Sequence, residues 1–202
     1  MVGSTLDEWK LLAAADQDLP TLDEAHLVSR FQRMIPAEYV ENLIETYRKA
    51  RDKRGAPTTP PKLFIAIQTD RVFRIPAIRL AEAQQQHNQP VYNYLFTWRS
   101  PILGGALGAC HALELGFLFG TYEEQFSGKG PAADALARNI QDAWLAFAHN
   151  GDPSCESLGK WPPYGERRET MILGEECHVE EALYDEERRA WEVIPSAASG
   201  WL

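Results

Sequence analysis

Three short segments with the length and apolar character of buried strands constrain the fold of this chain more than any other feature. They lie at residues 1–4, 91–98 and 170–173, and long stretches with helical patterning separate them. Strands joined through long helical connections are typical of a parallel sheet covered by helices, whereas a β-sandwich has short turns between its strands. The pattern therefore predicts an α/β fold with few strands and many helices.

The helical stretches are defined by their starts, ends and apolar stripes. Thr21 and Glu24 form a capping-box pattern that predicts a helix through about Gln32, and Pro36 begins a second helix with an apolar stripe. The remaining helices are expected at residues 62–86, 132–149 and 180–192. Pro76 lies inside the first of these and predicts a kink or a break there.

The number of strands is small for a sheet that stands alone. A length of 202 residues suits one domain, yet three strands make too small a sheet to stand alone in such a domain. Residues 1–4 also have the pattern of a buried core strand, and a natural domain rarely starts directly in such a strand. We therefore expect residues 1–202 to form the C-terminal part of a single α/β domain, with an incomplete sheet and with the N-terminal part absent.

Charge and cysteine content limit the partners and the chemistry. The net charge of -9 argues against nucleic acid and against anionic membrane surfaces, because both would repel the chain. No apolar run approaches the ~18 residues of a transmembrane helix. The three cysteines, Cys110, Cys155 and Cys177, are odd in number and widely spaced. They predict free thiols rather than a disulfide framework or a zinc site.

An acid and a histidine are the candidate catalytic groups. Glu8 follows the first predicted strand, and His111 lies in the glycine-rich loop after the second. In a nucleophile–histidine–acid triad, the acid orients the imidazole and stabilises the imidazolium formed when the base takes a proton. Acid before histidine is also the chain order of the α/β-hydrolases. The two residues therefore predict two members of a hydrolytic triad.

Each candidate has a structural alternative. Thr5 and Glu8 match a capping box, so Glu8 could simply cap a helix. His111 lies between small and apolar residues, and a histidine in such surroundings is more often a buried structural residue than a catalyst. Cys110 beside His111 suggests a thiol nucleophile, but adjacent loop residues usually point apart. The surroundings of the other four histidines indicate surface residues: His26, His87, His149 and His178.

The third member of the triad is missing from the sequence. No Gly-x-Ser-x-Gly occurs in the 202 residues, and this is the strand-to-helix turn that exposes the serine of an α/β-hydrolase. Triad members act as a unit, so loss of the nucleophile leaves His111 nothing to activate. We expect the chain to be inactive by itself.

Several segments, taken in order, resemble the type-B carboxylesterases, a family that includes the cholinesterases and the bacterial para-nitrobenzyl esterases. GACHALELGFLFG at residues 108–120 is similar to the family's histidine motif, and VGSTLDEW at residues 2–9 resembles the segment that carries the triad acid. Further similar segments are TDRVFRIPA at 69–77, PVYNYLF at 90–96, NGDP at 150–153 and WPPY at 161–164. Gly116 stands where many relatives have proline, which touches no chemistry.

The resemblance implies an α/β-hydrolase fold and the hydrolysis of carboxylic esters through an acyl-enzyme. It places His111 as the catalytic base, Glu8 as the triad acid and Glu114 as the acid that supports the loop from behind. Trp9, just past the acid, either lines the acyl or alcohol pocket or belongs to the core. No cofactor and no metal are implied. The expected partners are small-molecule carboxylic esters and the missing N-terminal part of the protein.

Two other functions stay open at this point. The resembling family includes adhesion ectodomains that bind partners without turnover, and a free-standing truncated chain would be an inactive product. Such a product would have unpaired strand edges that favour a homo-oligomer. The presence of both Glu8 and His111 favours the enzyme.

Overall fold

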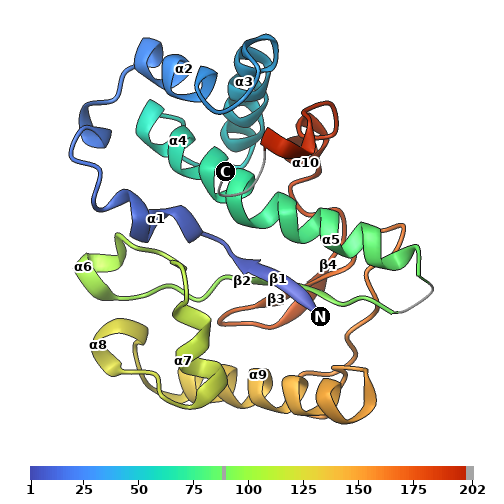
Figure 1. Ribbon diagram of the computed structural model, residues 1–202. Coiled ribbons are helices and arrows are strands. Elements are labelled where there is room, and N and C mark those ends of the chain that lie inside the picture. The colour runs from blue at the N-terminus through green and yellow to red at the C-terminus, as the bar shows by residue number, and fades with distance from the viewer. Residues whose placement is uncertain (88–89, 199–202) are drawn as a thin grey trace. The chain divides into compact units, whose positions relative to one another are not determined.

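The computed structural model describes residues 1–87 and 90–198 (Figure 1). The chain divides into two compact units. The first unit comprises residues 1–11 and 77–183, and the second comprises residues 12–76 and 184–202. All candidate site residues therefore belong to the first unit.

A four-stranded sheet is the framework of the first unit. Its strands, in spatial order, are β1 (Val2–Thr5), β2 (Asn93–Phe96), β3 (Thr170–Leu173) and β4 (His178–Glu180). β1, β2 and β3 run parallel, whereas β4 is antiparallel to β3. The predicted α/β class is confirmed, and the three predicted strands form its parallel part.

The fourth strand was not predicted, and its last residue, Glu180, is the first residue of the segment for which the sequence predicted a helix. Residues 180–192 were expected to be helical, but His178–Glu180 pairs with β3, with Val179 opposite Met171. The helix α10 is confined to Asp185–Ala190. Val179 packs against the apolar core, and this burial outweighs the helical preference of the charged residues around it.

The helices of the first unit pack an apolar core onto the sheet. Those with most or all of their residues in this unit are α1 (Glu8–Ala13), α5 (Ile75–Gln85), α6 (Ile102–Gly105), α7 (Leu113–Phe119), α8 (Glu124–Ser127) and α9 (Pro131–Asn150). Figure 1 shows α7 and α9 along one side of the sheet. Phe96 on β2 and Phe117 on α7 are fully buried, with ring centroids 5.7 Å apart. This contact holds α7, and the loop before it, against the sheet.

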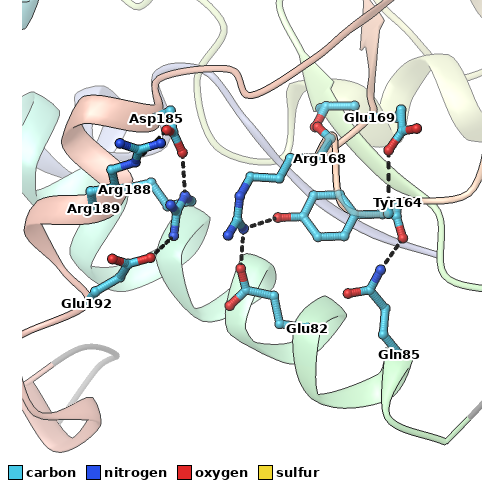
Figure 2. A network of polar contacts seen from close by, with 11 residues as sticks. Glu82, Gln85, Tyr164, Arg168, Glu169, Asp185, Arg188, Arg189 and Glu192 are labelled. Carbon is cyan, nitrogen blue, oxygen red and sulfur yellow. Dashed lines mark hydrogen bonds and ion pairs between the residues drawn. The ribbon is translucent and has the colours of Figure 1, made fainter.

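A polar network fixes the segment that leads into β3. Arg168 pairs with Glu82 on α5 and donates a hydrogen bond of 3.0 Å to the Tyr164 hydroxyl (Figure 2). The Gly165 N–H donates to the Glu169 carboxylate over 3.0 Å. The segment from Tyr164 to Glu169 is thereby tied to α5 and to itself just before the strand begins.

The second unit is helical in its described part. Its elements are η1 (Leu19–Thr21), α2 (Glu24–Gln32), α3 (Ala37–Lys53), α4 (Pro60–Thr69), the π-helical turn η2 (Asp70–Arg74), α10 and η3 (Ser196–Ala198). The apolar stripe predicted after Pro36 is confirmed as the buried face of α3.

The predicted cap of α2 is wrong. Asp23, in extended conformation, accepts a hydrogen bond of 2.8 Å from the backbone N–H of His26, which is the capping interaction of a helix start. Thr21 instead lies in η1, where its hydroxyl donates to the Asp18 carbonyl. The helix nevertheless ends at Gln32 as expected.

Pro76 neither breaks nor ends the helical path around it. The preceding turn η2 is π-helical, and the Ile75 N–H donates to the carbonyl of Asp70, five residues earlier. Proline lacks an N–H, and its ring clashes with the carbonyl four residues before it in a regular helix. A wider turn just before Pro76 relieves this clash.

The second unit contains a buried polar cluster. Asp70 accepts a hydrogen bond of 2.7 Å from the Arg74 Nε and another bond from the Tyr47 hydroxyl. The Trp191 indole N–H donates to the same hydroxyl over 2.8 Å. Burial alone would lower the pKa of Arg74, but the Asp70 carboxylate raises it above the ordinary value. The cluster therefore holds a charged pair away from water.

Replacement of Asp70 should destabilise the second unit strongly. Asp70→Ala leaves the Arg74 cation, whose side chain is 8% exposed, without its carboxylate, and breaking a buried pair in this way costs about 3–5 kcal/mol. Urea unfolding followed by circular dichroism measures the loss. Glu45→Ala, which removes an exposed pair with Lys49, is the matched control and should cost no more than about 1 kcal/mol. Equal losses in the two variants would contradict the role of the cluster.

Candidate catalytic site

The site begins with the pairing of β1 and β2. Thr5 lies opposite Phe96 at the carboxyl ends of these two parallel strands. Parallel neighbours end at the same edge of a sheet, so the segments that follow them leave side by side. The Leu6 N–H continues the ladder with a bond of 2.9 Å to the Phe96 carbonyl. The residues after β1 and after β2 are therefore brought to one place.

Glu8 is the first residue of α1 and is 4% exposed. One carboxylate oxygen, Oε1, accepts the Thr5 backbone N–H over 2.7 Å. The other oxygen, Oε2, lies 2.6 Å from Nδ1 of His111, a residue 103 positions away along the chain. An ionised carboxylate can only accept hydrogen bonds, so Nδ1 carries the proton in this contact. The structure thus brings the two predicted triad residues into direct contact.

His111 projects outward directly after a buried stretch, residues 107–110. Its side chain is 45% exposed, whereas its neighbours Cys110 and Leu113 are almost completely buried. Ala112 between them has a positive φ of 64°, which reverses the chain at the start of α7. A left-handed residue other than glycine is uncommon, and here it forms the turn between His111 and α7.

Cys110 is not placed to act as the nucleophile beside His111. Its side chain is fully buried in the apolar core, and burial raises the pKa of its thiol. A thiol becomes a nucleophile as the thiolate, which this environment disfavours. All three cysteines are free thiols.

Two further ionisable side chains have pKa values that are affected by the charge of Glu8. Glu114, in the first turn of α7, has a buried Oε2 without a hydrogen-bond partner in the described structure. Burial raises the pKa of Glu114, the charge of Glu8 raises it further, and His111 opposes both effects. Tyr94 on β2 lies in the same field, and its pKa is raised by burial and by the charges of Glu114 and Glu8. The supporting role of Glu114 stays a prediction.

Trp9 follows Glu8 on α1 and is half-buried. That exposure is compatible with either expectation for its indole, a place in a substrate pocket or a place in the core. Its role stays a prediction.

Sequence reasoning missed two residues next to the pair. Asp7 accepts the Ala109 N–H with its Oδ2 over 3.0 Å, and Gly108 lies against the same carboxylate. The signal was present for Asp7, since it directly precedes the acid. For Gly108 it was not specific, because the loop is rich in glycine throughout.

The remaining histidines are surface residues. All four are exposed, as expected: His26, His87, His149 and His178. Within the described residues, no group of three or more His, Cys, Asp or Glu side chains could hold a metal ion. None of the described helices combines the length and the apolar character needed to cross a bilayer.

Comparison with known proteins places this geometry in a family. The sequence model of the carboxylesterase family matches residues 1–191. The chain belongs to the carboxylesterase family. Its similarity to a para-nitrobenzyl esterase of Bacillus subtilis (strain 168) is 32% identity over 197 residues, which is 94% of this chain and 37% of that protein. A phenmedipham hydrolase of Pseudarthrobacter oxydans is 27% identical over 87% of this chain and 36% of its own length.

Solved structures confirm the α/β-hydrolase fold of this carboxylesterase chain. The crystal structure of a Geobacillus stearothermophilus carboxylesterase superposes with a TM-score of 0.78 at 33% identity, covering 94% of this chain and 39% of that enzyme. The chain therefore spans somewhat more than a third of the length of these relatives. The four-stranded sheet is correspondingly an incomplete version of the hydrolase sheet.

The burial of Glu114 predicts a pH-dependent effect on stability. Its pKa is raised in the folded chain, so the folded state binds more protons than the unfolded state just above the ordinary carboxyl pKa of about 4.3. The stability of the wild-type chain therefore falls as pH rises from that value through the raised pKa. Glu114→Gln has no such proton to lose.

The free energy of unfolding of Glu114→Gln, taken relative to that of the wild type, should therefore increase as pH rises. Urea unfolding of both proteins at about pH 4 and about pH 7.5 measures the change. A difference between the two proteins that stays constant over this range would contradict a raised pKa at Glu114.

Proposed function

We propose that this chain supplies the general base and the orienting acid of a serine carboxylesterase, and that residues 1–202 are the C-terminal part of a single α/β-hydrolase domain. The observation that carries the proposal is the 2.6 Å contact between the Glu8 carboxylate and Nδ1 of His111. Membership of the carboxylesterase family gives the contact its context. The serine nucleophile is proposed to come from polypeptide outside these 202 residues.

In the proposed mechanism, the Nδ1–H of His111 donates to Glu8, which fixes the ring tautomer and leaves Nε2 as the basic nitrogen. Nε2 takes the proton of the serine hydroxyl as the oxygen attacks the ester carbonyl, and Glu8 stabilises the imidazolium. The same nitrogen then gives the proton to the departing alcohol. A water molecule, activated in the same way, releases the acid from the acyl-enzyme.

Small carboxylic esters are the proposed substrates. The support is the names of the relatives, which describe ester hydrolases such as the Bacillus subtilis para-nitrobenzyl esterase. The net charge of -9 further favours neutral esters over anionic ones, because a negatively charged protein repels anions.

Complementation tests the proposal. The chain is coexpressed with the portion of the Bacillus subtilis para-nitrobenzyl esterase that precedes the matched region, and hydrolysis of para-nitrophenyl acetate and para-nitrobenzyl acetate is followed. We expect activity only when both pieces are present. His111→Gln and Glu8→Gln should each lower kcat by about 10⁴-fold, the loss typical for removal of a triad member.

Cys110→Ala is the matched control, because it changes a buried neighbour of His111 that takes no part in the reaction. It should retain most of the activity. Activity that survives His111→Gln would refute the proposed base. A well-folded pair of pieces that binds esters without turnover would favour a binding protein of the same fold instead.

A further inference from the structure

One side chain that the proposed reaction does not use joins the two segments that carry its acid and its base. The backbone N–H of Asp7 donates to the Ala109 carbonyl over 2.9 Å. In return, Asp7 Oδ2 accepts the Ala109 N–H over 3.0 Å. The two bonds close a ring between the acid segment and the histidine segment, so neither segment can slide past the other without breaking both.

The Asp7 carboxylate is itself held in place. Its second oxygen, Oδ1, lies 2.9 Å from the Lys10 ammonium, and both side chains are only 17% exposed. An ion pair between largely shielded side chains is stronger than one at an open surface. Lys10 therefore holds one carboxylate oxygen while Ala109 engages the other.

Gly108 leaves the space that the Asp7 carboxylate occupies. A Cβ atom at this position would lie 2.1 Å from Asp7 Oδ2 and 2.6 Å from the Lys10 Nζ. Gly108 also has a φ of 58°, a conformation that side-chain-bearing residues rarely adopt. The loop therefore approaches Asp7 at a residue that presents only backbone.

We infer that Asp7 is a positioning residue that fixes the His111 imidazole against Glu8. The two hydrogen bonds between Asp7 and Ala109 form a clamp. Asp7 lies one residue before Glu8 and Ala109 lies two residues before His111, so this clamp is adjacent to both members of the pair. The side chain of His111 is itself almost half-exposed. The inference rests on the proposed function, because it assigns the clamp to the acid–base pair of that reaction.

Nuclear magnetic resonance of the 202-residue chain, labelled with ¹⁵N in histidine, tests the inference without any added nucleophile. The readouts are the downfield Nδ1 proton of His111 and the tautomer of its ring, with His111→Gln used for assignment. We expect Asp7→Ala to lose the downfield proton and to mix the two tautomers. Asp7→Asn keeps an oxygen that can accept the Ala109 N–H and should restore both signatures.

Lys10→Met is the matched control, because it removes the ion pair and leaves the bonds to Ala109. It should retain the His111 signals with at most a small change in stability. A merely structural role for Asp7 would lower the thermal stability of Asp7→Ala while leaving the His111 signals unchanged, and that result would overturn the inference.

Failure of the inference is distinguishable from failure of the proposed function. Glu8→Gln should remove the downfield His111 proton in every background. A wild-type chain without a His111 proton that depends on Glu8 would refute the acid–base pair itself. A proton that depends on Glu8 but persists in folded Asp7→Ala would refute only the positioning role.

A second variant and a second measurement cover the case in which Asp7→Ala does not fold. Asp7→Ser retains a residue that suits a turn, but its hydroxyl is too short to reach Ala109, so it should lose the same His111 signatures. In the wild-type chain, the Ala109 amide should exchange with solvent far more slowly than an exposed amide does. Fast exchange of this amide would contradict the clamp directly.

Discussion

The parallel pairing of β1 with β2 is the constraint on which the candidate site depends. Thr5 and Phe96 end the two strands in register, and the next residues of each strand leave from one edge of the sheet. Closing a connection as long as the one between Glu8 and His111 has an entropic cost. The strand ladder and the core beneath α7 offset that cost, and the final contact between the two side chains needs only local adjustments. The geometry of the candidate site is a consequence of sheet topology.

The structure contains only one half of the capping-box pattern of Thr5 and Glu8: the Thr5 N–H donates to the Glu8 carboxylate, but Thr5 ends β1 and does not cap α1. Oε1 satisfies the Thr5 N–H and Oε2 faces His111. A carboxylate that is 4% exposed needs partners for both oxygens, because a buried charge without hydrogen bonds is costly. The backbone bond also fixes the carboxylate plane, so that the oxygen offered to the imidazole has a defined direction. A local backbone bond thus holds the Glu8 carboxylate in one orientation.

Much of the fold could be predicted from the sequence, because periodicity and composition report burial directly. The parallel strands, the buried face of α3 and the long helix α9 follow from such patterns. β4 was missed, since three residues in a charged segment carry little strand signal and its pairing depends on β3. The cap of α2 was placed on Thr21 rather than Asp23, because both residues suit a cap and only backbone conformation separates them. The turn before Pro76 depends on an extra backbone residue, which no composition rule reveals.

The candidate site, like the fold, could be predicted from the sequence only in part. Resemblance of motifs was enough to select Glu8 and His111 as candidates. The contacts beside them, namely the bonds between Asp7 and Ala109 and the close approach of Gly108 to Asp7, involve backbone atoms. Backbone contacts between distant segments leave almost no trace in side-chain patterns.

The bond from Thr5 to Glu8 has a consequence for the border of the sheet. β1 lies at one end of the strand order, and its N–H groups alternate in direction. Those of Val2 and Leu6 point to β2, so that of Thr5 points outward, where Glu8 accepts it. The carboxylate therefore occupies the last outward donor of this strand, and any additional strand aligned along β1 has to stop short of it. The carboxylate that contacts the imidazole is therefore also the group that limits how far along β1 a neighbouring strand can pair.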